Sequence, residues 1–391
     1  MAALKKTAMA LGLACALGTG LAGAAPANTI PRLDHAFVIL MENHHYTQII
    51  GNTQMPFLNG ANGVPGYADT ANLATNYFAV GHPSLTNYLE IVGGSNFGVV
   101  NDDSPAWHDY NCTPNIVSHV VADETATTNT CPIAGTGIDA ATPAVDTSNE
   151  GTPQEPIYNT YVAPAPTVGR SIADQLDERG LGWKSYQENL PPYGADKVNN
   201  SDGLLSDTVG AKFSAGMPKL YAVKHNPFVY FASVQAQGLR HIVGFDRLYA
   251  DLRSGDVPAL AFIAPNQCHD QHGRGGSEVG TGCSLDANTI AQGDAALKDL
   301  VTAIHASPAW SDGRSAIVVV WDENDYSSLS NQVVVVVETN YGARGLKSNL
   351  PYNHFSLLKT LEAGFGLPYL NHAADANVLP MADLFATGRR Q

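Results

Sequence analysis

The stretch Phe37-Val38-Ile39-Leu40-Met41-Glu42-Asn43 places a run of apolar residues directly before a carboxylate and an amide. A short apolar run is typical of a strand buried on both faces, as in a parallel sheet. Polar residues that follow such a strand lie where open α/β sheets bind their ligands. The stretch therefore predicts a central strand that ends in a metal site, with Glu42 and Asn43 as ligands.

Other apolar runs have the length of strands, and helical patterns lie between them. The expected strands are His35–Met41, Pro227–Val234, Ala259–Ala264, Ser315–Trp321 and Gln332–Glu338. Helical spacing of apolar residues is found in 85–92, after the capping-box pair Ser171 and Asp174, in 290–304 and in 358–365. This alternation predicts an α/β fold with a mostly parallel central sheet flanked by helices.

Residues 102–169 break the alternation, because Thr, Ala, Pro, Asn and Gly dominate there. Such a long irregular stretch is typical of a cap or binding loop, and a surface excursion held by a disulfide is the alternative. The length would allow two domains, but no repeat or linker is visible. We therefore expect a single domain over residues 28–391, with a cap insertion at 102–169.

The first 27 residues have the three parts of a secretory signal peptide. Lys5 and Lys6 precede an apolar stretch at 8–21, and small residues follow it. A membrane anchor is the alternative, but the apolar stretch is shorter than the roughly 20 residues of a membrane span. We expect residues 1–27 to be removed and the mature protein to be secreted or periplasmic, without stable membrane insertion.

Four cysteines follow residue 27, and an even number in an exported protein suggests two disulfides. Three pairings are possible, of which the local one joins Cys112 to Cys131 and Cys268 to Cys283. A zinc site is the alternative, although no Cys-x-x-Cys pair is present.

Without the first 27 residues, 19 basic side chains stand against 36 acidic ones, a formal charge of −17. A chain this acidic is a poor general binder of nucleic acid or of anionic membranes. The same acidity suits the binding of divalent cations.

The segment Gly81-His82-Pro83-Ser84 leads into the helical pattern at 85–92. Ser84 would lie at the first turn, where free backbone N–H groups and the positive end of the helix dipole favour a phosphate and an ionising hydroxyl. The alternative is that Ser84 only caps the helix, which is the usual role of Ser at this position.

Asp322 and Glu323 follow the apolar run that ends at Trp321, in the same manner as Glu42 and Asn43. Adjacent acids at a strand end are costly unless they are solvated or bind a cation. Two strands that end in oxygen ligands suggest a shared metal, which would lower the pKa of a bound hydroxyl and neutralise a phosphoryl oxygen. Solvated loop acids are the alternative.

Three further polar segments could contribute to the same site. Asp270 and His272 follow an expected strand closely enough to share a ligand, and His354 opens an expected helix. Lys224-His225-Asn226 precedes an expected strand and could supply a proton donor or a charge clamp for an anionic substrate. A lone His at a helix start is more often structural than catalytic, and the segment 224–226 could equally be a polar strand entry.

Together these motifs resemble the phosphoesterase family of secreted acid phosphatases and bacterial phospholipases C, within the alkaline-phosphatase-like superfamily. The resemblance covers about residues 34–370. The motifs that carry it, in chain order, are Met41-Glu42-Asn43, Thr75-Asn76-Tyr77-Phe78, His82-Pro83-Ser84-Leu85-Thr86-Asn87-Tyr88, Lys224-His225-Asn226-Pro227-Phe228, Pro265-Asn266 with Asp270 and His272, Trp321-Asp322-Glu323, and Asn353-His354-Phe355-Ser356-Leu357-Leu358.

The resemblance implies a phosphoryl-enzyme mechanism in which Ser84 matches the family's nucleophile. It implies Glu42, Asn43, Ser84, Asp322 and Glu323 as metal ligands. Many two-metal relatives have His where Glu323 stands, so an oxygen-rich site for Ca²⁺, Mg²⁺ or Mn²⁺ is expected rather than one for zinc.

The resemblance also assigns roles to the remaining polar segments. Asp270, His272 and His354 match a second metal's ligands or phosphate-binding groups, and Asn226 is a further candidate for such contacts. His225 or His354 would serve as the acid.

We therefore expect an exported, metal-dependent phosphatase that hydrolyses phosphate monoesters through a phosphoserine. Its partners would be small-molecule phosphate esters or a phospholipid headgroup, and no nucleic acid. The alternatives are a phospholipase C or other phosphodiesterase, a phosphoinositide phosphatase, and a non-catalytic, cation-stabilised binding protein.

Overall fold

The structure is a computed structural model that describes residues 29–99, 101–112, 129–134, 168–203, 220–273, 288–328 and 330–387. The expected signal peptide and most of the expected cap at 102–169 lie outside these residues. The division into domains therefore stays a prediction.

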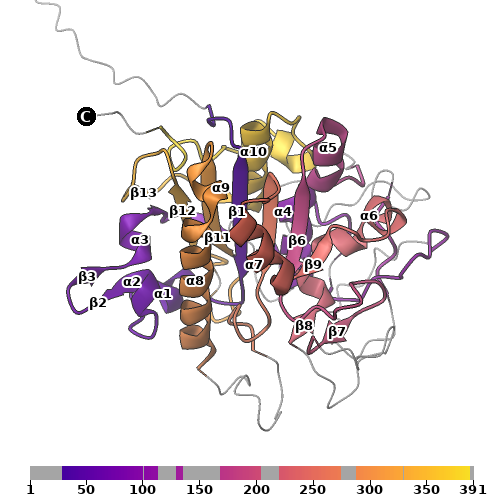
Figure 1. Ribbon diagram of the computed structural model, residues 1–391, viewed down its shortest axis with the longest axis horizontal. Helices are drawn as coiled ribbons and strands as arrows, with labels where there is room; N and C mark the ends of the chain where they lie inside the picture. The colour runs from indigo at the N-terminus through magenta and orange to yellow at the C-terminus, as the bar shows by residue number, and fades with distance from the viewer. Residues whose placement is uncertain are drawn as a thin grey trace, which may run out of the picture.

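An eight-stranded sheet forms the centre of the fold (Figure 1). Its order is β13 (Lys347–Ser348), β4 (Asn72–Ala74), β12 (Val335–Thr339), β11 (Ser315–Trp321), β1 (His35–Met41), β10 (Leu260–Ala264), β6 (Trp183–Gln187) and β9 (Ile242–Gly244). All pairings are parallel except the two made by β12. The expected α/β fold with a mostly parallel sheet is confirmed.

The predicted central strand β1 pairs with β10 on one side and β11 on the other. Ala36 to Met41 are fully buried, as are Ala316 to Trp321 of β11. Burial on both faces explains why these strands are continuous apolar runs rather than alternating ones. The register pairs Met41 with Trp321, so both strands end at the same level of the sheet.

Helices cover both faces of the sheet. In Figure 1, α7 (Phe245–Ser254) and α8 (Thr289–Ala306) lie in front of it, while α4 (Ser84–Gly93) and α10 (His354–Phe365) pack against each other behind it. The expected capping box opens α5 (Ile172–Arg179). The short helices are α1 (Tyr46–Ile49), α2 (Pro56–Asn59), α3 (Tyr67–Thr70), α6 (Ala232–Ala236) and α9 (Pro308–Ser311).

The remaining elements of the described part of the chain are 3-10 turns and two-residue strands. The 3-10 turns are η1 (Val223–His225), η2 (Pro227–Tyr230) and η3 (Asn371–Ala374). Two-residue strands pair as β2 (Gly60–Ala61) with β3 (Val64–Pro65), β5 (Tyr77–Phe78) with β14 (Tyr352–Asn353), and β7 (Asn200–Ser201) with β8 (Tyr221–Ala222). The β5–β14 pair holds the start of α10 beside the segment that leads to α4.

The expected strand Pro227–Val234 was wrong, because these residues form η2 and the start of α6. Phe228 to Phe231 are fully buried, so their apolar run matched a buried strand. A short apolar run does not distinguish a strand from a buried turn. Pro227 fits the first position of a helical turn, where its missing N–H and fixed φ cost nothing.

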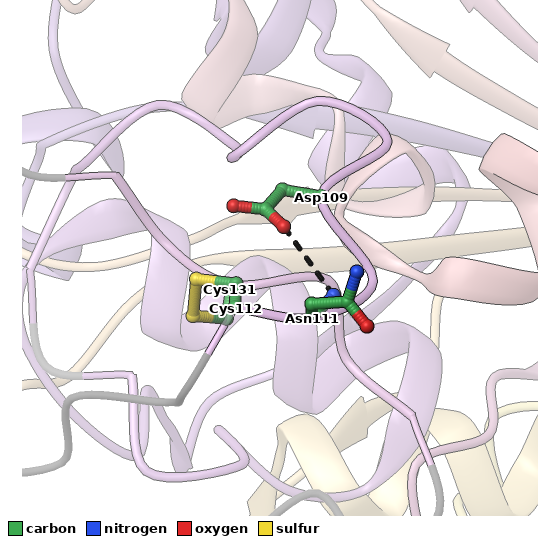
Figure 2. Close-up of a disulfide and its surroundings, with 4 residues drawn as sticks. All are labelled: Asp109, Asn111, Cys112 and Cys131. Atoms are coloured by element: carbon green, nitrogen blue, oxygen red, sulfur yellow. Dashed lines mark hydrogen bonds between the residues drawn. A yellow bond between two sulfur atoms is a disulfide. The ribbon is translucent and has the colours of Figure 1, made fainter.

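Cys112 and Cys131 form a disulfide, as expected for the local pairing (Figure 2). Their Cα atoms lie 5.5 Å apart. Asn111 N donates to Asp109 Oδ1 over 3.3 Å in the turn beside the bridge. Cys268 is also disulfide-bonded, but its expected partner Cys283 lies outside the described residues.

Among the residues that the structure describes, no helix is both long enough and apolar enough to cross a membrane.

Candidate active site

The ends of β1 and β11 bring four predicted ligands together. Glu42 and Asp322 are fully buried and Glu323 is 2% exposed. Asp322 N donates to the Met41 carbonyl over 2.9 Å, and Asn43 N donates to Asp322 Oδ1 over 3.1 Å. These acids are therefore not solvated loop residues, and that alternative is wrong.

Ser84 is the first residue of α4 and points its hydroxyl at this acidic cluster. Its Oγ lies 3.1 Å from Glu42 Oε2 and 3.1 Å from Glu323 Oε1. A hydroxyl has one proton and can donate to only one of the two carboxylates at a time. The alternative role as a helix cap is wrong, because the N-cap residue is Pro83 and no side chain caps from that position.

Several oxygen atoms of the cluster fit a cation. Glu42 Oε1, Asn43 Oδ1 and Asp322 Oδ2 are buried and make no hydrogen bond within the described part of the chain, although Glu42 Oε1 lies 3.1 Å from His225 Nε2. Buried acceptors are almost always paired, so such atoms call for a group that supplies positive charge. Carboxylate and amide oxygens suit Mg²⁺, Ca²⁺ or Mn²⁺ better than zinc. The residues present therefore fit a divalent metal ion.

The electrostatics of the acidic cluster also favour a bound cation. Burial raises the pKa of Glu42 well above its usual range, and the charges of Asp322 and Asp270 raise it further. Burial and the charge of Glu323 likewise raise the pKa of Asp322. Like charges gathered in a buried site disfavour ionisation, and a bound cation removes that cost.

A second group of side chains surrounds His225, which lies in η1. His225 Nε2 is 3.1 Å from Glu42 Oε1, and His225 Nδ1 is 3.1 Å from Asp270 Oδ2. Tyr88 of α4 stacks on the imidazole, with ring centroids 5.3 Å apart. Glu42, His225 and His272 offer ligand atoms that all lie within 4.8 Å of one another. The predicted His225, Asp270 and His272 thus adjoin the first group.

Lys224 adds a positive charge between these groups. Its Nζ is 3.0 Å from Asp102 Oδ2 and 3.0 Å from His272 Nε2. Asp102 Oδ1 accepts from Leu85 N in the first turn of α4, which ties Lys224 to the helix that carries Ser84. The positive charge of Lys224 also acts to lower the pKa of Glu42. The site therefore pairs an acidic half with a buried ammonium group.

Two predicted residues contribute differently from what the sequence suggested. His354 Nε2 contacts the Asp322 carbonyl at 2.6 Å, and His354 Nδ1 contacts Tyr77 Oη at 2.9 Å. Burial lowers the pKa of His354 to about 4, so its ring is neutral with both nitrogens occupied. The Asn226 side chain accepts from Ser185 Oγ and donates to Tyr221 Oη.

Sequence reasoning gave no role to His82 and Asn87, which both bind Glu323. His82 Nδ1 is 2.6 Å from Glu323 Oε2, and Asn87 Nδ2 donates to the same oxygen over 3.2 Å. Tyr326 stacks on His82 with ring centroids 4.1 Å apart. His82 and Asn87 stand two residues before and three after Ser84, so proximity to the nucleophile candidate was the one available signal.

The chain belongs to the Phosphoesterase family, whose sequence model matches residues 61–368. This confirms the family that the motifs resembled. A solved structure titled as a protein in the alkaline phosphatase superfamily, from Vibrio parahaemolyticus, is similar with 14% identity and a TM-score of 0.47. That similarity covers 91% of this chain and 72% of the other.

Three curated relatives have names that state an activity. The chain is 24% identical over 351 residues to a "Probable acid phosphatase" of Kluyveromyces lactis, covering 88% of this chain and 61% of the relative. It is 25% identical over 315 residues to a "Phosphate-repressible acid phosphatase" of Penicillium chrysogenum, covering 79% and 56%. The chain thus spans about six-tenths of the length of these two acid phosphatases.

The third relative matches over nearly its whole length. The chain is 27% identical over 382 residues to a "Phosphatidylinositol-3-phosphatase" of Mycobacterium tuberculosis, covering 95% of this chain and 91% of the relative.

Proposed function

We propose that this protein is a metal-dependent phosphatase that hydrolyses phosphate monoesters with Ser84 as the nucleophile. The observation that carries the proposal is the position of Ser84 Oγ, 3.1 Å from a carboxylate oxygen of both Glu42 and Glu323. A buried hydroxyl between two acids is poised to lose its proton when a cation offsets the negative charge.

Glu42, Asn43, Ser84, Asp322 and Glu323 would hold the metal ion. When bound, the ion would lower the pKa of the Ser84 hydroxyl and neutralise charge on the phosphoryl group. Asn87 and His82 would keep Glu323 oriented, since both contact its Oε2. Asn43 adopts the left-handed conformation, with φ of 53°, which Asn tolerates better than most residues.

The reaction would proceed in two displacements at phosphorus. Ser84 Oγ forms a bond to phosphorus while the bond to the leaving oxygen breaks, and that oxygen takes a proton. Water then attacks the phosphoserine, which releases inorganic phosphate and restores the hydroxyl. Lys224 would stabilise the dianionic phosphoryl oxygens, because its ammonium is buried beside His272 and linked to the first turn of α4.

Burial and the charges of Lys224 and His272 lower the pKa of His225, so it is the preferred phosphoryl contact, and it would be a proton donor once a bound phosphate offsets those effects. It lies between Glu42 and Asp270, within the group that also includes His272. His354 would instead act as a positioning residue, because its ring nitrogens contact Tyr77 and the Asp322 main-chain carbonyl rather than the carboxylates of the site. Asn226 would support the turn that carries His225 rather than contact phosphate.

A phosphoinositide phosphatase is the second candidate function. The relative named for that activity is covered over 91% of its length, against 61% and 56% for the two acid phosphatases. Comparing phosphate release from phosphatidylinositol 3-phosphate and from glycerol phosphate distinguishes the two candidate functions. A phosphoinositide phosphatase should prefer the first substrate, and a general phosphomonoesterase should hydrolyse both. A phospholipase C or other phosphodiesterase would instead release a phosphorylated headgroup from phosphatidylcholine.

Export is part of the proposal. The signal-peptide pattern of residues 1–27 and the disulfide between Cys112 and Cys131 support an oxidising compartment outside the cytoplasm. Sequencing the amino terminus of the exported protein tests it, with cleavage expected after Ala24, Ala25 or Ala27.

The experiment that tests the nucleophile is Ser84→Ala, assayed on an aryl phosphate. Loss of at least about 1,000-fold in kcat is expected, while the circular dichroism spectrum and Tm stay near those of the wild type. Ser254→Ala, at the end of α7, is the matched control and should keep full activity. A Ser84→Ala protein that retains most of its turnover excludes Ser84 as the nucleophile. A wild-type protein that hydrolyses no phosphate ester would instead leave the non-catalytic binding protein as the better description.

A further inference from the structure

A separate cavity lies at the carboxyl ends of β10, β6 and β9, on the side of the sheet covered by α7 and α8. Its volume is about 330 Å³, at the lower end of the range for small-molecule sites. The residues that line it are Glu188, Phe245, Tyr249, Pro265, His269, Gln292, Ala295, Ala296, Asp299 and Leu300. None of them belongs to the proposed catalytic machinery.

Aromatic and small side chains shape this cavity. Phe245 and Tyr249 stand one turn apart on α7, with ring centroids 6.2 Å apart and ring planes at 88°. Across the cavity, α8 presents Ala295 and Ala296, whose methyl groups leave room that larger residues would fill. Because both rings line the cavity at right angles to each other, they can contact the apolar part of a small ligand from two sides.

The charges of the cavity are mainly negative. Glu188 and Asp299 are its two acids and His269 is its one basic side chain. The Glu188 carboxylate is fixed by Asn266 N and by His269 Nδ1, both at 2.9 Å. Burial raises the pKa of Tyr249, and both carboxylates raise it further, so the ring lies in their combined field. The hydrogen bond to Glu188 raises the pKa of His269, so a protonated His269 offsets Glu188, and Asp299 leaves the cavity with a net negative charge that favours a cation.

We propose that this cavity binds a small organic cation, an ammonium group with apolar substituents. The rings of Phe245 and Tyr249 would attract it through cation–π interactions, and Asp299 would supply the opposite charge. An inorganic cation fits less well, because the Glu188 oxygens already accept from protein donors and the remaining walls are largely apolar.

The cavity adjoins the candidate active site through one loop. His269 lines the cavity, while the next residue, Asp270, contacts His225 in the site. Gln271 fixes this loop, since its side chain bonds the Ile290 carbonyl and accepts from Trp321 Nε1. The cation site does not depend on the proposed function, because none of its contacts involves Ser84 or the acidic cluster.

The test measures binding of tetramethylammonium and of tert-butanol, a neutral molecule of similar shape, to the full chain by calorimetry or ligand-observed NMR. Wild type and Ser84→Ala are expected to bind tetramethylammonium equally, and at least about 10-fold more tightly than tert-butanol. Equal affinity for the two probes, or no binding of either, overturns the proposal. The Ser84→Ala variant lacks the proposed nucleophile but keeps every residue of the cavity. Its cation binding therefore tests the cavity independently of the proposed catalytic function.

Variants then locate the binding. Ala296→Phe, which fills the cavity, should abolish binding, and Asp299→Asn and Tyr249→Leu should each weaken it by about 3- to 10-fold. Asp312→Asn, an exposed acid outside the cavity, is the control and should bind as wild type does. Unchanged affinity in Ala296→Phe and Asp299→Asn, both at positions outside the core, shows that the cation binds elsewhere and rejects this cavity.

Discussion

His82 Nδ1 lies 2.6 Å from Glu323 Oε2, and both side chains are buried. The contact joins the loop before α4 to the end of β11, so it connects the segment that carries Ser84 to the acidic cluster. The stacked ring of Tyr326 covers His82 on the other side. We therefore expect His82 to fix the orientation of Glu323.

Replacing His82 by Gln should lower both activity and divalent-cation affinity by about 10- to 100-fold, the usual effect of losing a residue that orients a ligand. Titration of chelator-treated protein with Mn²⁺ measures the affinity. His305→Gln, at the end of α8, is the matched control and should leave both values unchanged. A His82→Gln protein with normal cation affinity would show that Glu323 does not need this partner.

Removal of divalent ions by a chelator should abolish phosphatase activity and lower Tm, because the buried acids lose the charge that offsets them. Ca²⁺, Mg²⁺ or Mn²⁺ should restore both more effectively than Zn²⁺, since oxygen ligands dominate the site. In the Asp322→Asn variant, the added ions should raise activity and Tm only weakly. Full turnover in thoroughly chelated protein, verified by metal analysis, would rule out metal dependence.

Lys224→Met should reduce kcat/KM for p-nitrophenyl phosphate by roughly 100-fold. The loss should be smaller for bis(p-nitrophenyl) phosphate, because a diester carries one negative charge and a monoester two. Inhibition by inorganic phosphate should weaken in parallel. Lys347→Met, at an exposed pair with Asp69, serves as the control. Equal losses on the two substrates would mean that Lys224 acts on structure and not on the phosphoryl charge.

The Glu338 carboxylate on β12 should make stability depend on pH. Burial acts to raise its pKa, but a hydrogen bond from His305 and the charges of His305 and Arg344 outweigh burial and lower it. A lowered pKa stabilises the fold above the pKa of the unfolded chain, and the benefit is lost as pH falls through the folded-state value.

The variant Glu338→Gln should therefore lose about 1–3 kcal/mol at pH 7. The gap to wild type should narrow as the pH falls below about 4.5, the region where an unfolded Glu titrates. Denaturant unfolding at several pH values measures this gap, and a gap that stays constant down to pH 3 would contradict it.

Apolar runs predicted β1, β10 and β11 because these strands are buried on both faces. The same argument missed β6, whose sequence Trp183-Lys184-Ser185-Tyr186-Gln187 is largely polar. Lys184 is accommodated there by an ion pair with Asp251 of α7, a partner 67 residues away that local sequence does not reveal. Tertiary pairing of this kind overrides local propensity.

In the candidate site too, local sequence predicted some features, and tertiary contacts decided the others. Residues at strand ends were predicted to converge, and Glu42, Asn43, Asp322 and Glu323 do so. The sequence could not tell which histidine faces the cluster and which supports it, because this depends on the direction of each ring. His225 and His354 differ only in their tertiary partners, which are Glu42 and Asp270 for the first and Tyr77 and a main-chain carbonyl for the second.

The hydrogen bond from Asn43 N to Asp322 Oδ1 joins residues 279 positions apart. While the chain is unfolded, Glu42 and Asp322 are therefore separate acids in water, with the weak cation affinity of single carboxylates. They come together only when β11 pairs with β1, which requires that the chain has been made as far as residue 322. Any ion held by both strands is thus acquired where folding finishes, and the ions of that compartment decide which one is loaded.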